Sequence, residues 1–374
     1  MLATLENTRS EFPILQRKIQ LSSCSQSALH RDVKGAIARY VQTWEEQGMD
    51  WEGWMAACEH ARNLFARMIH ASPSEIAIVS SVSHGASSIA ASIDNRSRKK
   101  VLITEFDFPT IGHVWLSHRD RFHIDFIKSD ENNPLEADHY EQAVDEQTLL
   151  VSTSHVSFYN GNKQDIKAVA EAVHRKGAYL FVDAYQSFGQ TPINVKEMGI
   201  DMLCTGMQKY GLGIPGFAYL YIDKKISRQL QPRITGWFGQ ENPFAFDIKN
   251  LQYGEHTKRF DSGTFPMING FAAEAALKIL SQLDIKQVES YLETLSQVAI
   301  DAAEHYGLVL KSPKDVKAKG SNTAIYVENA SAVEKQLLEK GIIVSARNDV
   351  IRIAPHYYNT EQDVRTALSE LAKI

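Results

Sequence analysis

Short apolar runs alternate with amphipathic stretches along residues 14–200, and two further apolar runs follow. Seven runs predict β-strands, over 75–79, 100–104, 122–127, 148–153, 179–182, 202–205 and 217–222. Between them, helical periodicity predicts helices, for instance over 33–46, 54–69 and 165–176. Apolar strands separated by helices are typical of a parallel sheet. We therefore expect an α/β fold, with a mostly parallel seven-stranded sheet and helices on both faces.

The pattern changes after residue 222. A segment rich in glycine, proline and aromatic residues covers 231–265. Beyond it the periodicity predicts two long helices, three short strands and a last helix, over 270–283, 287–305, 324–327, 341–345, 349–353 and 360–372. These elements predict a smaller C-terminal α/β domain. We place the large domain at 16–255 and the small domain at 256–374 with 1–15, and we expect the substrate in the cleft between them.

The composition and net charge of the chain argue against several classes of function. The chain is 44% hydrophobic and 23% charged, and its net charge of −5 gives no support to binding of nucleic acid or of an anionic membrane surface. The N-terminus lacks the charged start and apolar core of a signal peptide, and no apolar stretch is long enough for a membrane span. The three cysteines, Cys24, Cys58 and Cys204, fit neither a disulfide framework nor a metal site. We therefore expect a cytoplasmic protein without a nucleic-acid, membrane or metal partner.

Candidate chemistry centres on Lys209, which lies in a Gly-rich turn after the strand that ends at Asp183. Taken singly, such a lysine is most often a solvated loop residue and such an aspartate most often caps the next element. Together they suit a site for pyridoxal 5′-phosphate (PLP), because ligands of open α/β sheets bind at the carboxyl ends of the strands. The lysine would hold PLP as a Schiff base, and the aspartate would keep the pyridine nitrogen protonated.

Other strand ends carry groups that suit the same cofactor. Ser83 and His84 open a helix directly after a strand, where backbone amides favour a phosphate, although serines at helix starts are mostly plain caps. Phe108 follows another strand end and is expected to stack on a planar ring, the alternative being a core phenylalanine. His155 and Gln186 also follow strand ends and are expected to hydrogen-bond the cofactor, whereas a lone histidine is more often structural.

Arg352 lies within an apolar strand near the C-terminus. A buried guanidinium needs an anionic partner, because an unpaired charge is costly to bury. The α-carboxylate of a substrate would serve as that partner through a bidentate contact, and a structural salt bridge is the alternative.

These residues resemble those of the class V aminotransferase group of fold-type I PLP-dependent enzymes, which includes cysteine desulfurases, isopenicillin-N-epimerase-like enzymes and kynureninases. The resemblance runs from about residue 20 to residue 364. It implies that Lys209 and Asp183 hold the cofactor, that Gln186 packs beside its ring and that Arg352 binds the substrate carboxylate. It also implies that Ser83 and His84 belong to the phosphate-binding turn.

Within the group several pieces are most similar to kynureninase: the Phe108-Pro109-Thr110 segment, Gly236-Trp237-Phe238-Gly239, and the turn Ser262-Gly263-Thr264. The resemblance implies a homodimer in which Trp237 and Thr264 reach the cofactor of the partner subunit. The chain departs from kynureninases at Gln208, where they carry a tyrosine. It departs from desulfurases because residues 316–352 contain no cysteine.

We therefore predict a homodimeric PLP enzyme that acts on a small α-amino acid. Lys209 is expected to form the Schiff base and then to take the Cα proton. Kynureninase-like side-chain cleavage, or a related lyase reaction, is the first expectation for the next step. Transamination and epimerisation are the alternatives, and desulfuration is disfavoured.

Overall fold

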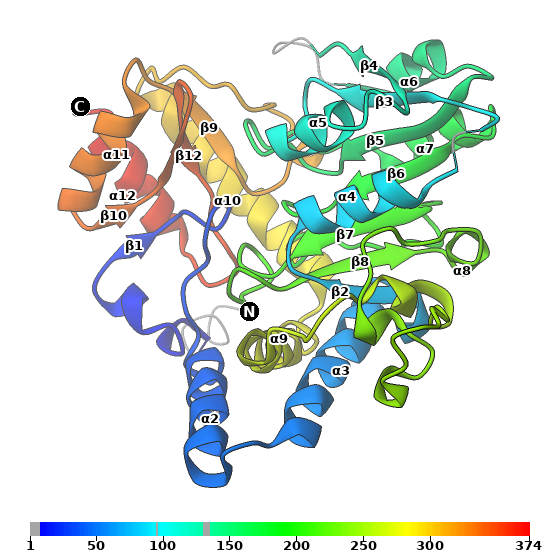
Figure 1. Ribbon diagram of the computed structural model, residues 1–374. Helices are drawn as coiled ribbons and strands as arrows, with labels where there is room; N and C mark the ends of the chain where they lie inside the picture. The colour runs from blue at the N-terminus through cyan, green and yellow to red at the C-terminus, as the bar shows by residue number, and fades with distance from the viewer. Residues whose placement is uncertain (1–7, 95, 130–134) are drawn as a thin grey trace.

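A seven-stranded sheet forms the centre of the larger part of the molecule (Figure 1). The structure is a computed structural model and describes residues 8–94, 96–129 and 135–374. The strand order is β2-β8-β7-β6-β5-β3-β4. Its strands are β2 (Ile76–Val79), β3 (Lys100–Thr104), β4 (His123–Ile127), β5 (Thr148–Ser154), β6 (Tyr179–Asp183), β7 (Met202–Gly206) and β8 (Ala218–Ile222). Only β8 runs antiparallel to its neighbours among these strands, so the sheet is mostly parallel.

Both faces of this sheet are buried, which explains why its strands are continuous apolar runs. In β6, Leu180 and Val182 belong to one hydrophobic cluster and Phe181, between them, belongs to another. Successive side chains of a strand point to opposite faces, so the two clusters are the two sides of the sheet. Helices α4 (Val82–Ser92) and α5 (Pro109–Leu116) cover one side.

The opposite side is covered by several helices. They are α3 (Trp51–Met68), α7 (Ile166–His174), α9 (Met267–Leu280) and α10 (Ile285–His305). Helix α9 also packs against α2 (Arg31–Gln47), and α6 (Ala137–Ala143) packs against α7. This second layer therefore joins the sheet to the C-terminal part of the chain (Figure 1).

The C-terminal part contains a second, antiparallel sheet in the order β11-β12-β9. Its strands are β9 (Thr323–Tyr326), β11 (Ser345–Arg347) and β12 (Val350–Ile353), and α10, α11 (Ala330–Glu339) and α12 (Glu361–Leu371) pack on and beside them. The N-terminal segment joins this part, because β1 (Ile19–Gln20) pairs in parallel with β10 (Ile342–Ile343). A further bridge links Ser22 to Ala354. Residues from both ends of the chain thus lie side by side (Figure 1).

The predicted fold class is confirmed, and the seven predicted strands agree with the observed ones to within one residue at each end. One element was wrong: the strand predicted over 341–345 is two strands, β10 and β11. They separate because β10 pairs with the N-terminal segment while β11 pairs with β12. The domain limits at 16–255 and 256–374 stay a prediction. Across the described ranges, none of the helices has the length and apolar character needed to cross a membrane.

Candidate active site

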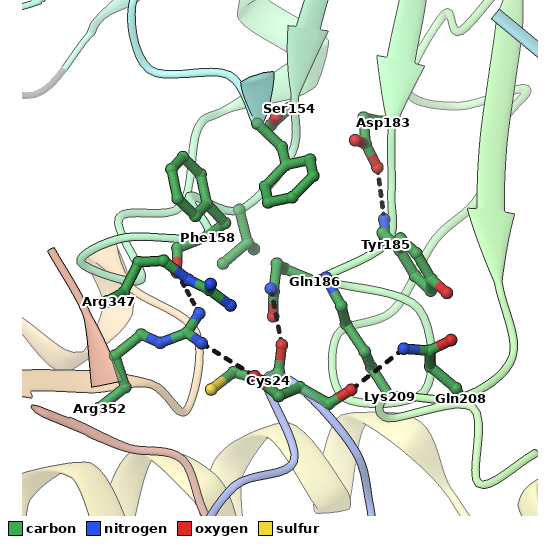
Figure 2. Close-up of a pocket in the computed structure, with 13 residues that line it drawn as sticks. Cys24, Ser154, Phe158, Asp183, Tyr185, Gln186, Gln208, Lys209, Arg347 and Arg352 are labelled. Carbon is green, nitrogen blue, oxygen red and sulfur yellow. Dashed lines mark hydrogen bonds between the residues drawn. The ribbon is translucent and has the colours of Figure 1, made fainter. Parts of the chain in front are cut away.

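A cavity of about 290 Å³ opens at the carboxyl ends of β5, β6 and β7 (Figure 2). It is lined by Cys24, Ser25, Phe108, Ser154, Val156, Phe158, Asp183, Tyr185, Gln186, Gln208, Lys209, Arg347 and Arg352. These residues come from three distant parts of the chain: the N-terminal segment, the ends of the central strands and the β11–β12 hairpin. The position agrees with the general rule that open α/β sheets bind ligands where their parallel strands end.

Lys209 reaches this cavity from the tight turn that follows β7. The turn is closed by hydrogen bonds from Leu212 N to Lys209 O (3.1 Å) and from Gly213 N to Met207 O (2.8 Å). The amine lies 4.1 Å from the centre of the Tyr185 ring and 5.8 Å from that of Phe108. Burial lowers the pKa of Lys209 to about 8, although the Asp183 charge acts in the opposite direction. A substantial fraction of the amine is therefore neutral and nucleophilic near neutral pH.

Asp183 ends β6 with a carboxylate that is only 7% exposed. Its Oδ1 accepts a hydrogen bond from Tyr185 N (2.8 Å). Burial raises the pKa of Asp183, and the nearby Lys209 charge opposes that shift. A buried carboxylate with so few donors suits a ligand that brings its own N–H group. The protonated pyridine nitrogen of PLP is such a donor, so Asp183 fits the cofactor.

The start of α4 provides a second feature that fits PLP. Ser81 caps the helix by accepting from His84 N (3.1 Å), and Ser83 Oγ lies 3.3 Å from Thr110 Oγ1 in the first turn of α5. Two helix N-termini therefore meet beside Phe108, and both favour an anion. His84 Nε2 is buried and has no hydrogen-bond partner among the residues that the structure describes. An oxyanion such as a phosphate would satisfy it if this nitrogen carries the proton.

Phe108 is held at the cavity by its neighbour Asp107. The Asp107 carboxylate accepts from Thr104 N (3.0 Å), Thr104 Oγ1 (2.9 Å) and Ser154 Oγ (2.7 Å). Burial raises the pKa of Asp107 to about 7 in spite of these donors. The Phe108 ring meets Phe158 edge-on at 5.1 Å between centroids. One face of the cavity is therefore aromatic, as a planar cofactor requires.

Arg352 enters from β12 and is 1% exposed. Its guanidinium donates to Phe158 O (2.7 Å), Ser25 Oγ (2.9 Å), Ser345 Oγ (2.7 Å) and, at 3.4 Å, Ser345 O. None of these acceptors is a carboxylate, and no ion pair to Arg352 occurs among the residues that the structure describes. The salt bridge considered from the sequence is therefore absent from that part of the chain.

The structure thus places five of the predicted residues around one cavity: Lys209, Asp183, Gln186, Phe108 and Arg352. The other five, Ser83, His84, His155, Trp237 and Thr264, do not line it.

The outlying residues lie in different places. His155 is buried directly behind the strand ends, where its backbone N donates to Asp183 O (3.0 Å) and burial lowers the pKa of its ring to about 3. Trp237 stacks on Phe238 with centroids 4.2 Å apart. Thr264 is exposed.

Several lining residues were not predicted, most notably Ser25, Phe158 and Arg347. The N-terminal pair Cys24 and Ser25 is tied to the cavity because Gln186 Nε2 donates to Cys24 O (3.0 Å) and Gln208 Nε2 to Ser25 O (3.4 Å). Contacts between residues so far apart in the chain leave no local sequence pattern from which they could be predicted. Arg347 was detectable, because the apolar strand of Arg352 and the Asn348-Asp349 turn before it indicate a hairpin.

A fold of this kind, with a lysine and a buried aspartate at neighbouring strand ends, is that of a PLP-dependent enzyme. The profile of the Aminotransferase class-V family matches residues 27–371, and the chain belongs to this family. Proteins of the family depend on PLP, and a solved structure with this fold, a mutant of C-DES, contains glycine covalently linked to PLP.

Three comparisons describe the relationship. An uncharacterized aminotransferase, YcbU, of Bacillus subtilis (strain 168) is 41% identical over 98% of this chain and 97% of its own length. A kynureninase of Geobacillus thermodenitrificans (strain NG80-2) is 25% identical over 99% of this chain and 91% of its own. The apo structure of a cysteine desulfurase from Thermococcus onnurineus NA1 superposes with a TM-score of 0.89, at 20% identity, over 98% of this chain and 97% of that one. The last likeness establishes the fold.

Proposed function

We propose that this protein removes the Cα proton from a small α-amino acid and then cleaves the amino acid's side chain, as a kynureninase-like enzyme or a related lyase. The observation that carries this proposal is the position of Lys209, whose amine lies in the cavity with a pKa lowered to about 8. Bound PLP supplies an acceptor for the electrons that remain when the proton leaves. The protein has to bind, orient and deprotonate the substrate.

Each task falls to residues around the cavity. Lys209 Nζ holds the cofactor before substrate arrives and afterwards accepts the Cα proton. The Asp183 carboxylate accepts a hydrogen bond from the pyridine nitrogen and keeps it protonated. Phe108 packs on the ring and Gln186 lies beside it. Ser83 and His84 hold the phosphate at the α4 N-terminus, and His155 supports the strand end that carries Asp183.

Substrate orientation falls to Arg352. Its acceptors are neutral carbonyl and hydroxyl groups, so the full positive charge is available to a carboxylate. The hydrogen bonds that the guanidinium donates to Ser25 and Ser345 fix its plane before the substrate binds, which reduces the entropy lost on binding.

Side-chain cleavage also requires a proton donor over the side chain. Tyr185 lines the cavity, and burial, and then the Asp183 charge, raise the pKa of its hydroxyl, so that it is protonated when a substrate enters. Two other side chains considered for this task, Trp237 and His256, do not line the cavity within one chain. Tyr185 is therefore our candidate for the donor.

The proposal includes a homodimer in which Trp237 and Thr264 complete the partner's site. Trp237 lies beside a group of strongly exposed apolar side chains, including Phe246 at 72% and Ile248 at 96%. Exposed apolar residues in one segment are unfavourable in water and typical of an interface. A second copy of the chain is the occupant that the resemblance to kynureninase favours.

Transamination is the second candidate, because the relative of 41% identity is described as an aminotransferase. Lys209 alone suffices for that reaction, since it requires only that the Cα proton be moved to another atom and not that the side chain be cleaved. The products distinguish these two reactions from each other and from epimerisation. Alanine from L-kynurenine indicates side-chain cleavage, a keto acid indicates transamination, and an inverted stereocentre indicates epimerisation.

The test begins with cofactor binding. Purified protein incubated with PLP is expected to show the visible absorbance band of lysine-bound PLP, and Lys209→Ala is expected to lose both the band and all turnover. Lys176→Ala is the matched control, because Lys176 is exposed and pairs with Glu146 far from the cavity. A band that survives in Lys209→Ala would contradict the proposal at its first step.

A further inference from the structure

The cavity contains a second arginine for which the proposed chemistry has no use. We propose that Arg347 binds an anionic group at the end of the substrate's side chain, so that the substrate is an α-amino acid with a second carboxylate or an equivalent oxyanion. The inference rests on the proposed function, since it takes the cavity as the place where an amino acid binds. It adds the class of side chain.

The β11–β12 hairpin places both arginines on the same face. Ser345 lies opposite Arg352 in the antiparallel pairing, and Arg347 lies opposite Val350. Residues opposite each other share a face, as do residues two apart along a strand, so Ser345, Arg347, Val350 and Arg352 all point to one side. Arg347 and Arg352 are therefore diagonal neighbours, about 7–8 Å apart at the backbone. Figure 2 shows both side chains entering the cavity from this hairpin.

The two arginines differ in what they bind. Arg352 makes four hydrogen bonds to protein acceptors, which fix its position. The Arg347 side chain has neither a hydrogen bond nor an ion pair among residues 8–94, 96–129 and 135–374, and its Nε is buried without a partner. A buried guanidinium nitrogen left unpaired is costly. Arg347 therefore has donors free for a ligand.

The acidic side chains at the hairpin, Glu334 and Asp349, accept hydrogen bonds from other groups. Glu334 Oε1 accepts from the backbone N of Ala346 (2.9 Å), and Asp349 Oδ1 accepts from Tyr159 Oη (2.7 Å). Burial, and then the Arg352 charge, lower the pKa of Arg347, although the charge of Glu334 acts from a distance in the opposite direction. The lowered pKa means that the positive charge is unfavourable where it lies. An anion that enters the cavity relieves this cost.

The balance of charge in the cavity also favours an anionic side chain on the substrate. Lys209, Arg347 and Arg352 are the cationic side chains of its lining, against the single carboxylate of Asp183. Lys209 holds the cofactor and Arg352 is placed for an α-carboxylate, so each has an assigned partner. The remaining cation, Arg347, is matched by an anionic side chain on the substrate. A planar guanidinium binds a carboxylate through two parallel hydrogen bonds, so it selects its ligand by charge and by planar shape.

The test compares acids with amides of the same shape. The PLP-loaded enzyme is offered aspartate and asparagine, and glutamate and glutamine, and kcat/KM or Cα hydrogen exchange is measured for each. The wild-type enzyme is expected to prefer one acid over its amide by about 10- to 100-fold. Arg347→Met is expected to remove this preference by lowering kcat/KM for the acid, with little change in kcat/KM for the amide. Arg347→Lys, which keeps charge but not the planar fork, is expected to retain part of it.

Two variants serve as controls. Arg352→Met is expected to lower kcat/KM for the acid and for the amide by the same factor, since both substrates carry the α-carboxylate. Arg365→Met repeats the substitution on the exposed face of α12 and is expected to change nothing.

A binding measurement separates failure of this inference from failure of the proposed function. Succinate or glutarate is expected to raise the melting temperature of the PLP-loaded wild type more than propionate does, whether or not any amino acid is turned over. The difference should vanish in Arg347→Met. The inference is overturned if kcat/KM of the wild type is the same for acid and amide, or if Arg347→Met lowers kcat/KM for both by the same factor. It is also overturned if this variant weakens the binding of PLP instead.

Discussion

The amine of Lys209 lies over the face of the Tyr185 ring, 4.1 Å from its centre. An aromatic face attracts a cation, so this contact favours the charged form of the amine, whereas burial favours the neutral form. Burial lowers the pKa of Lys209 to about 8 against the opposing charge of Asp183. The ring face of Tyr185 adds to the stabilisation of the charged form.

Removing the ring face is expected to lower the pKa of Lys209 further. A cation–π contact of about 1 kcal/mol corresponds to somewhat less than one pKa unit. In PLP-free protein, labelling of Lys209 by trinitrobenzenesulfonate, followed by peptide mass spectrometry, should rise with pH through a midpoint near 8, since only the neutral amine reacts. Tyr185→Leu should move this midpoint to lower pH, and Tyr185→Phe should leave it in place. Identical midpoints for all three proteins would contradict the role of the ring.

A second prediction concerns Cys24, which lines the cavity but is firmly held. Its carbonyl accepts from Gln186 Nε2, and the neighbouring Ser23 N donates to Ala354 O (3.1 Å). A nucleophile that carries sulfur away from the cofactor needs mobility, which this segment lacks. Cys24→Ala is therefore expected to keep Cα hydrogen exchange within about threefold of wild type, as do most substitutions that remove no essential contact.

Release of sulfide from cysteine is the measurement that would contradict this prediction for Cys24. If the wild type releases sulfide from cysteine in the presence of a reductant and Cys24→Ala does not, then Cys24 is a nucleophile and desulfuration has to be restored among the candidate reactions. Cys58→Ala is the matched control, because Cys58 is buried against Met267, outside the cavity.

The exposed apolar segment around Ile248 predicts the oligomeric state. Ile248→Asp places a charge where we expect the partner subunit to pack, so the variant should sediment as a monomer while the wild type sediments as a dimer. PLP affinity should fall with it, because Trp237 and Thr264 no longer reach a second site. Leu338→Asp is the control, since Leu338 is 47% exposed on α11. A wild type that sediments as a monomer at micromolar concentration would refute the dimer.

Lys319 predicts a pH dependence of stability. It is 2% exposed, and its Nζ donates to Ser296 Oγ (3.0 Å), Gly320 O (2.9 Å) and Thr323 Oγ1 (3.1 Å) without a carboxylate. Burial lowers the pKa of Lys319 from 10.5 to about 7. Between these two values the unfolded chain binds more protons than the folded one, so this residue makes stability rise with pH.

Lys319→Met removes that dependence. The stability of the variant relative to the wild type is expected to be highest near and below pH 7 and to fall, by about 5 kcal/mol, as the pH approaches 10. Melting temperatures between pH 6 and 10 provide the measurement. Two curves that stay parallel over this range would mean that Lys319 is charged in the folded protein.

The strands were predictable from the sequence because both faces of the central sheet are buried, which leaves continuous apolar runs such as 179–182. Lys209, Asp183 and Arg352 were detectable because charged residues are rare next to or within such runs. The contribution of Ser25 was not detectable, since it depends on a parallel pairing between the two ends of the chain. The split of 341–345 into β10 and β11 has the same origin, because Ile342, Ile343 and Val344 form one apolar run and only the pairing partners on either side of Val344 differ.

The pairing of the first strand with the last part of the chain has a consequence for biosynthesis. Ala354 N donates to Leu21 O and Ser23 N to Ala354 O, so a segment made early by the ribosome is held by residues made much later. Until β12 has left the exit tunnel, the cavity lacks both its floor at Cys24 and Ser25 and its two arginines. A nascent chain can therefore expose Lys209 and Asp183 long before it can hold a substrate in the orientation that Arg352 sets.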